Sequence, residues 1–316
     1  GLILFDRNCR GADQVRALVN QFKDALGRDR TLIMIDQEGG RVQRMKPPVW
    51  RQLPAAETIG ALFRDSPGRG VRLARLIAQL NGADLAAHGI NMNCAPVLDI
   101  RTPNTTKAIG DRSYGGDVAS VTTLGRAVAE GLISAGVAPV IKHLPGHGRA
   151  VVDSHHELPF IEASLDELRA TDFAPFRELA DMPAAMTGHV VLNAVDPHEP
   201  ASASARVIEA IIRGEIGFDG LLISDDLGMR ALSGSAAERA RSVLNAGCDL
   251  ALHCNATLAE RIEVADVVPL LEGRSLERYQ ACFLAKQGGE EIDVEMAVAA
   301  LDEALAAGRA TGTVSS

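Results

Sequence analysis

A short segment at 142–155 carries histidine, lysine and aspartate side chains, the types that move protons or hold a charged ligand. Pro145 and the glycines that follow it exclude a regular helix, so His143 and His147 cannot form an i, i+4 metal pair on one helical face. We expect a loop instead, which follows the C-terminal end of an apolar strand at 137–141. A histidine beside a carboxylate on such a loop is suited to general acid–base catalysis.

The scaffold for this segment is predicted from seven apolar runs that alternate with segments of helical periodicity, a pattern typical of a parallel sheet. The first helix is expected to begin with Asp13 as its N-cap and to end at Gly27. Ser164 and Ser235 each precede a glutamate by three residues, which is the form of a capping box. These units fit a (β/α)8 barrel better than a doubly wound sheet, although one strand is missing. The runs lie at 1–5, 31–36, 90–100, 137–142, 184–191, 221–225 and 248–253.

The composition fits one soluble domain spanning 1–316, with 47% hydrophobic and 23% charged residues. A net charge of −9 argues against a surface for nucleic acid or anionic membranes. No apolar run reaches the roughly 18 residues of a membrane span and no signal peptide opens the chain, so we expect a cytoplasmic protein. Five scattered cysteines predict buried reduced thiols. The tail after about residue 301 is expected to fray, and the oligomeric state stays open with a monomer favoured.

Polar side chains recur where the predicted strands end, which is the catalytic face of a barrel. The turn at 36–44 adds further charges, on Glu38, Arg41 and Arg44. Carboxylates and arginines that converge on one face suit a ligand with many hydroxyl groups. The residues at the strand ends are Asp36, Asp99, Lys142, His143, His189, Asp225 and Asp226.

These segments resemble glycoside hydrolase family 3. The stretch at 212–228 looks like the signature around that family's nucleophile, and other motifs follow the order of its NagZ-type β-N-acetylhexosaminidases, from residue 1 to about 255. The family's usual phenylalanine before the motif's proline is Leu144 here, which should leave His143 in place. The family has a further strand and helix before the segment that matches Gly1, so the resemblance implies a barrel whose first strand–helix unit is absent from the chain. The other motifs lie at 36–41, 95–99, 109–114, 142–148 and 153–155.

The resemblance implies a role for each matched residue. Asp225 is the nucleophile, and His155 paired with Asp153 is the acid/base. No metal and no cofactor are implied, and the partner is a small sugar or muropeptide: the substrates are N-acetylglucosamine on 1,6-anhydro-N-acetylmuramic acid, in peptidoglycan recycling. Five further residues bind the terminal N-acetylglucosamine, namely Asp36, Arg44, Arg112, Lys142 and His143.

The chemistry can also be followed from the residues. Cleavage of a glycosidic bond needs a proton for the leaving oxygen and a carboxylate for the anomeric carbon, and a histidine can supply the proton near neutral pH. In an extended segment Asp153 would project to the same side as His155 and hold its other ring nitrogen. Alternation along a strand should let only one of Asp225 and Asp226 face the site. The loop that contains Gly146 is expected to close over the sugar as a mobile lid.

Other functions remain open. A metal-dependent hydrolase would need convergent ligands, which His143, His155, His189 and Asp225 could nominally supply. A sugar-binding barrel without activity is a second alternative. Within the family, a β-glucosidase and a glycoside phosphorylase are closer alternatives, since a histidine acid/base does not repel an incoming phosphate as a carboxylate would.

Overall fold

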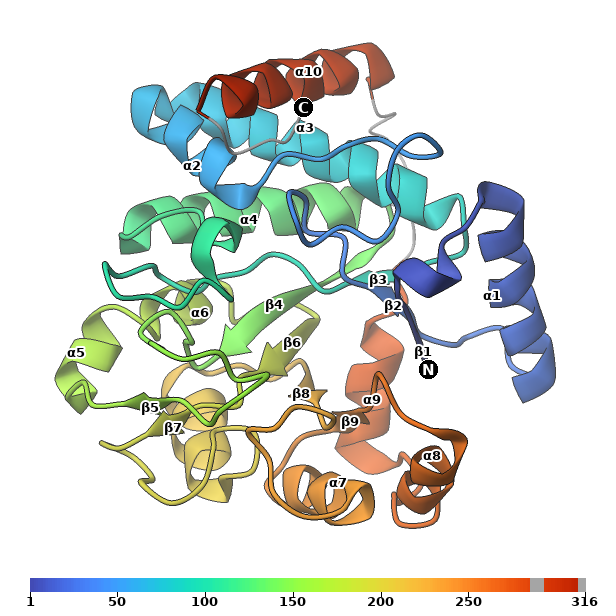
Figure 1. Cartoon of the computed structure of the whole chain (residues 1–316), viewed down its shortest axis with the longest axis vertical. Helices are drawn as coiled ribbons and strands as arrows, with labels where there is room; N and C mark the ends of the chain where they lie inside the picture. The colour runs from blue at the N-terminus through green and yellow to red at the C-terminus, as the bar shows by residue number, and fades with distance from the viewer. Residues whose placement is uncertain (285–292, 312–316) are drawn as a thin grey trace.

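The computed structural model describes residues 1–284 and 293–311, which form a curled parallel sheet covered by helices (Figure 1). The sheet has seven strands in the order β1-β2-β3-β4-β6-β8-β9, and every neighbouring pair is parallel. Each apolar run of the sequence overlaps one of them, so the predicted alternation is confirmed, although β4 and β8 extend beyond their runs to Leu144 and Asp226. The strands are β1 (Leu2–Leu4), β2 (Ile33–Ile35), β3 (Met92–Asn93), β4 (Ala138–Leu144), β6 (Ala184–Thr187), β8 (Leu221–Asp226) and β9 (Leu250–Leu252). A separate parallel pair joins β5 (Phe160–Ile161) to β7 (Val191–Leu192).

Both faces of the sheet are buried, because successive side chains point to opposite sides of a strand. Met34, Val140 and Ile223 belong to the core inside the curl, whereas Ile35 and Ile141 pack outward against helices. This arrangement explains why the strands read as continuous apolar runs instead of alternating ones.

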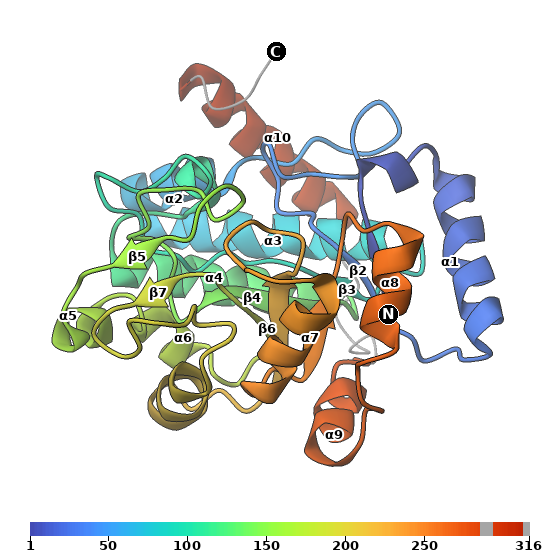
Figure 2. The same ribbon diagram turned by 60° about the horizontal axis from the view of Figure 1, so that its bottom comes forward.

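Helices surround the curled sheet, with α3, α4 and α10 stacked along one side (Figures 1 and 2). The capping boxes at Ser164 and Ser235 are confirmed, since each serine accepts from the backbone amide of the glutamate three residues on. Gly27 ends the first helix with φ 61°, as predicted, but the N-cap is Gly11; Asp13 lies inside the first turn. The helices are α1 (Ala12–Leu26), α2 (Ala56–Asp65), α3 (Pro67–Ala86), α4 (Val118–Ser134), α5 (Leu165–Ala170), α6 (Ala174–Glu178), α7 (Ala236–Asn245), α8 (Leu258–Ala265), α9 (Gly273–Ala281) and α10 (Val294–Thr311), with a π-helix at Val207–Glu215 and 3₁₀ turns at Asp6–Asn8 and Gly110–Arg112.

The tail does not fray at residue 301 as expected. Helix α10 runs on to Thr311 and packs against α2 and α3. Its Leu301 and Ala304 are buried, so burial of one apolar face stabilises a segment whose composition alone favours disorder. The last part of the predicted tail, 312–316, lies outside the described residues.

The sheet is open between β1 and β9, each of which has one partner strand within the described residues. These edge strands are half-buried, whereas β2 and β4 are fully buried. At the end of α9, the side chains of Tyr279 and Phe283 pack against the core inside the curl of the sheet. Over residues 1–284 and 293–311, the structure therefore has the curvature of a barrel but not a closed ring of eight strands.

Two expectations from composition can be compared with the fold. The cysteines are all free thiols; four are buried, as expected, and Cys9 is half-buried. Within 1–284 and 293–311, none of the helices is long and apolar enough to cross a membrane.

Candidate active site

The C-terminal ends of the strands surround an open cavity of about 340 Å³. Every residue to which the family resemblance gives a role lines this cavity, although these residues come from widely separated parts of the chain. Three other polar residues expected on this face, Glu38, Asp99 and His189, are not among its walls. The structure brings together Asp36, Arg44, Arg112, Lys142, His143, Asp153, His155 and Asp225, and adds Phe5, Arg41, Met186, Asp226, Cys254 and Asn255 to the walls.

The end of β4 leaves regular pairing with β6 where the site begins. Lys142 pairs with Met186 and Leu144 pairs with Thr187, so His143 is an extra residue without a partner on β6. Such a β-bulge twists a strand and re-aims the side chains beside it. The bulge explains how two successive residues of one strand both line the cavity. Leu144 is buried in the outer core, and His143 keeps its predicted place.

Lys142 is the centre of a buried cluster of charges. Its Nζ donates to Asp36 Oδ1 at 3.0 Å and to Glu38 Oε1 at 2.6 Å, and Arg44 Nη2 lies 3.1 Å from Asp36 Oδ2. Burial alone would raise the pKa of Asp36, but Lys142 and Arg44 hold that pKa well below its usual range. Burial would likewise lower the pKa of Lys142, and the two carboxylates raise it instead. Lys142 and Asp36 are therefore charged at neutral pH, and the cluster offers fixed donors and acceptors to a polar ligand.

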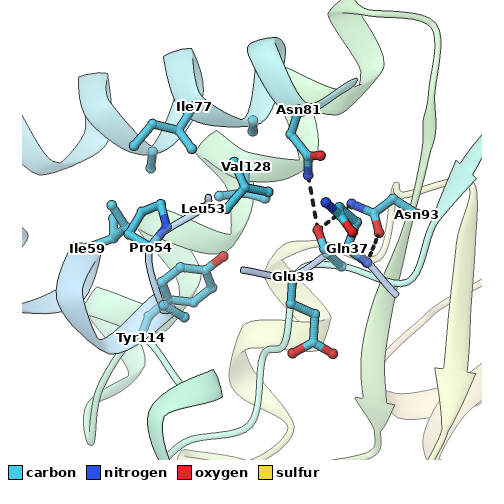
Figure 3. A pocket seen from close by; sticks show the side chains of 14 residues that line it. Gln37, Glu38, Leu53, Pro54, Ile59, Ile77, Asn81, Asn93, Tyr114 and Val128 are labelled. Atoms are coloured by element: carbon cyan, nitrogen blue, oxygen red, sulfur yellow. Dashed lines mark hydrogen bonds between the residues drawn. The ribbon is translucent and has the colours of Figure 1, made fainter. Parts of the chain in front are cut away.

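Glu38 ties this cluster to Arg112. Its carboxylate accepts from Arg112 Nε and Nη2, both at 2.8 Å, which is a bidentate pair. Burial opposes ionisation of Glu38, yet Arg112 and Lys142 lower its pKa to about 2. Glu38 reaches an internal pocket that it shares with Tyr114 (Figure 3). Arg112 thus meets the cavity in a fixed orientation.

Gln37 fixes the turn that carries Arg44. Its side-chain oxygen accepts from the backbone amides of Arg44 at 2.9 Å and Met45 at 3.0 Å. Its backbone carbonyl accepts from the side-chain amides of Asn81 and Asn93, both at 3.0 Å, and Figure 3 shows these two side chains converging on it. These hydrogen bonds hold the turn against α3 and β3. The backbone that carries the Arg44 side chain is therefore fixed in position.

Asp99 orients His143. Its carboxylate is fully buried and accepts from His143 Nδ1 at 2.6 Å and from the backbone amide of His147 at 2.7 Å. Because a carboxylate only accepts, Nδ1 carries the hydrogen, and Nε2 is left for a ligand. His147 itself is buried outside the cavity walls, and burial lowers its pKa to about 4.

A second bulge, at the end of β8, places two neighbouring acids in the cavity. Ile223 pairs with Leu250 and Asp226 pairs with Leu252, so β8 has one residue more than β9 over this interval. The expectation that alternation admits only one of Asp225 and Asp226 is therefore wrong, because the ladder is irregular at that point.

The two acids nevertheless differ in what their oxygens contact. Asp226 Oδ1 accepts from the backbone amides of Gly228 at 2.9 Å and Cys254 at 3.0 Å, so this carboxylate caps the chain turns beside it. Asp225 Oδ1 accepts from the amide of Asp226 at 2.8 Å, and its Oδ2 has no hydrogen bond within the described part of the chain. Burial would raise the pKa of Asp225, but His189, His143 and the Asp226 amide lower it. Asp225 is thus ionised and has an oxygen open to a ligand; Asp226 Oδ2 also has no hydrogen bond in the described chain, so the two acids differ in the role of Oδ1, which in Asp226 holds two chain turns.

Asp153 and His155 form a pair at the rim of the cavity. Asp153 Oδ1 accepts from His155 Nδ1 at 2.8 Å and from the His155 backbone amide at 2.9 Å. Burial raises the pKa of Asp153, but these two hydrogen bonds outweigh it and lower the pKa. The segment is a turn, in which His156 and Glu157 donate to the Asp153 carbonyl, so the expected extended geometry is wrong although the pairing is found. The imidazole side chain is 63% exposed, which leaves Nε2 accessible to a ligand.

Sequence reasoning placed Glu38 and Asp99 on the catalytic face without giving either a role in the site. Their partners, Arg112 and His143, are distant in the chain, so only the position of each acid after a strand could have pointed to them. For the proposed metal ligands, His143, His155 and His189 each use Nδ1 in a hydrogen bond within the protein. Among the side chains described, no group of three or more histidines, cysteines or acids is arranged to hold a metal ion.

Comparison with known proteins agrees with these motifs. Residues 1–279 match the glycosyl hydrolase family 3 N terminal domain. A beta-hexosaminidase of Alkalilimnicola ehrlichii is 41% identical over 259 residues, which are 81% of this chain and 73% of that protein. The crystal structure of NagZ from Neisseria gonorrhoeae in complex with N-trifluoroacetyl-D-glucosamine superimposes with a TM-score of 0.85 at 33% identity, covering 97% of this chain and 90% of the other. A family 3 beta-N-acetylglucosaminidase from Paenibacillus has a TM-score of 0.76 at 34% identity, covering 99% of this chain and 57% of the other.

Proposed function

The chain belongs to glycoside hydrolase family 3, and from that membership we propose that it is a retaining β-N-acetylglucosaminidase that removes terminal N-acetylglucosamine. One observation carries the proposal: the free oxygen of Asp225 and the exposed imidazole of His155 line the same cavity. A nucleophile and a proton donor on either side of one bond are what a retaining glycosidase needs.

In the first half of the reaction, Asp225 forms a bond to the anomeric carbon while the bond from that carbon to the glycosidic oxygen breaks. The proton on His155 Nε2 passes to the leaving oxygen, so the aglycone departs as an alcohol. Asp153 accepts from Nδ1 and stabilises the imidazolium that precedes this transfer, as the aspartate does in a Ser-His-Asp triad.

In the second half, a water molecule attacks the anomeric carbon and gives its proton to His155 Nε2. The bond to Asp225 breaks, and its electron pair returns to the carboxylate. Two successive displacements at one carbon retain the β-configuration of the released sugar. The enzyme is then in its starting charge state, with the imidazole protonated and Asp225 ionised.

The remaining cavity residues hold the sugar. Asp36 accepts from hydroxyl groups, while Lys142, Arg44 and Arg112 donate to them, each fixed by its ion pairs. His143 presents Nε2 because Asp99 holds its other ring nitrogen. Rigid donors and acceptors of this kind keep the anomeric carbon in line with the nucleophile.

The biological substrates that we propose are muropeptides in which N-acetylglucosamine is linked to 1,6-anhydro-N-acetylmuramic acid. The protein would act in the cytoplasm, as a monomer, in peptidoglycan recycling. Support for this finer assignment comes from the resemblance to the NagZ type and from relatives named beta-hexosaminidase. We further propose that a strand between β1 and β9 completes an eight-stranded barrel, because both edges leave backbone groups without a ladder partner in the described chain.

One assay tests the proposed activity. Aryl β-N-acetylglucosaminide and aryl β-glucoside are offered separately, each with and without inorganic phosphate. We expect release of N-acetylglucosamine at a rate that phosphate does not change. Faster turnover of the glucoside would indicate a β-glucosidase. A sugar phosphate among the products would indicate a phosphorylase. No turnover of either substrate would leave the sugar-binding barrel as the better account.

A further inference from the structure

His189 follows β6 and is fully buried, outside the cavity walls. Both of its ring nitrogens have partners: Nδ1 lies 2.6 Å from Ser202 Oγ, and Nε2 lies 3.0 Å from the backbone carbonyl oxygen of Asp226. A carbonyl oxygen only accepts, so Nε2 carries the hydrogen, and Nδ1 accepts from the Ser202 hydroxyl. The neutral imidazole therefore satisfies both contacts, and burial favours this form by lowering the pKa of His189.

The Asp226 carbonyl lies at the end of the β8 bulge, where pairing with β9 resumes with Asp226 opposite Leu252. Side chains add to the backbone bond that the Leu227 amide donates to the Leu252 carbonyl at 2.8 Å. Ser224 Oγ donates to the Asp225 carbonyl at 2.8 Å and accepts from the Leu252 amide at 3.1 Å, which ties the bulge to β9. His189 supplies the tie on the opposite side, from the segment after β6.

Ser202 is itself held in place. It is fully buried, and its neighbour Ala201 donates from its backbone amide to the Val190 carbonyl at 2.8 Å, which brings the segment around Ser202 against the segment that carries His189. The hydroxyl can therefore orient the imidazole without a large loss of side-chain entropy on ordering. Two hydrogen bonds in series thus connect Ser202, through the His189 ring, to the backbone of Asp226, which follows Asp225 in β8.

We propose that His189 is a positioning residue for Asp225: oriented by Ser202, it holds the Asp226 carbonyl and so fixes the bulge that aims the Asp225 carboxylate into the cavity. This inference rests on the proposed role of Asp225 as nucleophile. The sugar-binding side chains lie on β4 and in the segments after β2 and β3, and within the described residues none of them forms a hydrogen bond with His189. Loss of the tie should therefore slow attack on the anomeric carbon more than it weakens sugar binding, and a misplacement near 1 Å costs about 10²-fold in rate.

The test compares three variants of the full chain with a matched control. His189→Leu removes both hydrogen bonds and fills the buried site with an apolar side chain instead. His189→Gln keeps a donor in the position of Nε2, and Ser202→Ala removes only the orienting hydroxyl. His198→Gln is the control, because His198 is exposed and no side-chain hydrogen bond of it is found in the described chain.

We expect His189→Leu to lower kcat for a dinitrophenyl β-N-acetylglucosaminide by about 10²-fold while the affinity for N-acetylglucosamine as an inhibitor stays within a few-fold. His189→Gln should recover most of that loss, Ser202→Ala should fall between, and the control should match the parent chain. A purely structural role would lower the melting temperature and inhibitor affinity together, with glutamine no better than leucine, and that result would overturn the inference.

Two further outcomes separate this inference from the proposed function. If the parent chain forms a covalent adduct on Asp225 but His189→Leu turns over as fast as the parent, the positioning role alone is lost. If the parent chain forms no adduct on Asp225, the proposed function fails and the positioning role fails with it. Should His189→Leu not fold, Ser202→Ala decides, because unchanged kcat in that variant contradicts the path from Ser202 to Asp225.

Discussion

Replacement of Glu38 by glutamine should destabilise the protein strongly at neutral pH. The side chain of Glu38 is 7% exposed. It accepts two hydrogen bonds from Arg112 and forms an ion pair with Lys142. The substitution leaves these two cations in a buried site with one negative charge fewer. Removing one partner of a buried ion pair typically costs about 3–5 kcal/mol, because the remaining charge loses its compensation.

Linkage gives a second value for the same interaction. The pKa of Glu38 falls from 4.5 to about 2 in the folded protein. Such a difference corresponds to stability on the order of 3 kcal/mol at neutral pH. Because the folded pKa is the lower one, this stability is fully present above pH 4.5 and is lost as the pH falls through about 2. The two values agree, so we expect a loss of about 3 kcal/mol.

The assay is urea unfolding of the parent chain and Glu38→Gln between pH 7 and pH 2.5. Glu130→Gln serves as the control, since Glu130 pairs with Arg75 at 3.4 Å with both side chains 43% exposed, where an ion pair contributes about 1 kcal/mol or less. The difference in free energy of unfolding between the parent chain and Glu38→Gln should be large at pH 7 and should decrease below pH 4.5. A gap under about 1 kcal/mol at pH 7, or one independent of pH, would refute the account of the charge cluster.

Further predictions concern the acid/base, a loop glycine and the sheet edges. His155→Ala should slow hydrolysis of sugar leaving groups by roughly 10²- to 10⁴-fold, yet give a burst with a dinitrophenyl leaving group, which needs little protonation; equal slowing without a burst would assign His155 a binding role. Gly148→Ala should lower melting temperature and activity because its Cβ would collide with the Ile100 carbonyl, whereas Gly68→Ala, with open space at its Cβ, should do neither; equal behaviour of the two would contradict the tight packing of this loop. A chain extended before residue 1 by one strand–helix unit, about 30 residues, should melt higher and turn over faster than the chain of 316 residues; equal stability and activity would show that β1 and β9 need no further partner.

Local patterns in the sequence were sufficient for the strands and for several helix ends. Continuous apolar runs marked all seven strands of the sheet, because both faces are buried. The capping boxes at Ser164 and Ser235 involve residues three apart, so they can be found without tertiary information. Helix α10 was missed as an ordered element because its stability depends on α3, which is remote in sequence.

The composition of the site was predictable, but its geometry was not. The motifs that carry the family resemblance identified all the residues that line the cavity in the proposed roles, because a motif match does not depend on tertiary contacts. The alternation argument failed at Asp226 because a β-bulge depends on pairing with β9, which a single strand does not reveal. For the same reason Glu38 was recognised as a polar residue near the site but not as the partner of Arg112.

The central claim, that Asp225 is the nucleophile, is tested most directly by trapping. The protein is incubated with a 5-fluoro derivative of N-acetylglucosaminyl fluoride, and the labelled peptide is mapped by mass spectrometry after proteolysis. We expect one adduct, on Asp225, and none in Asp225→Asn, which should fold normally and be inactive. An adduct on Asp226, whose carboxylate is held by the amides of Gly228 and Cys254, or full turnover without any adduct, would contradict the account.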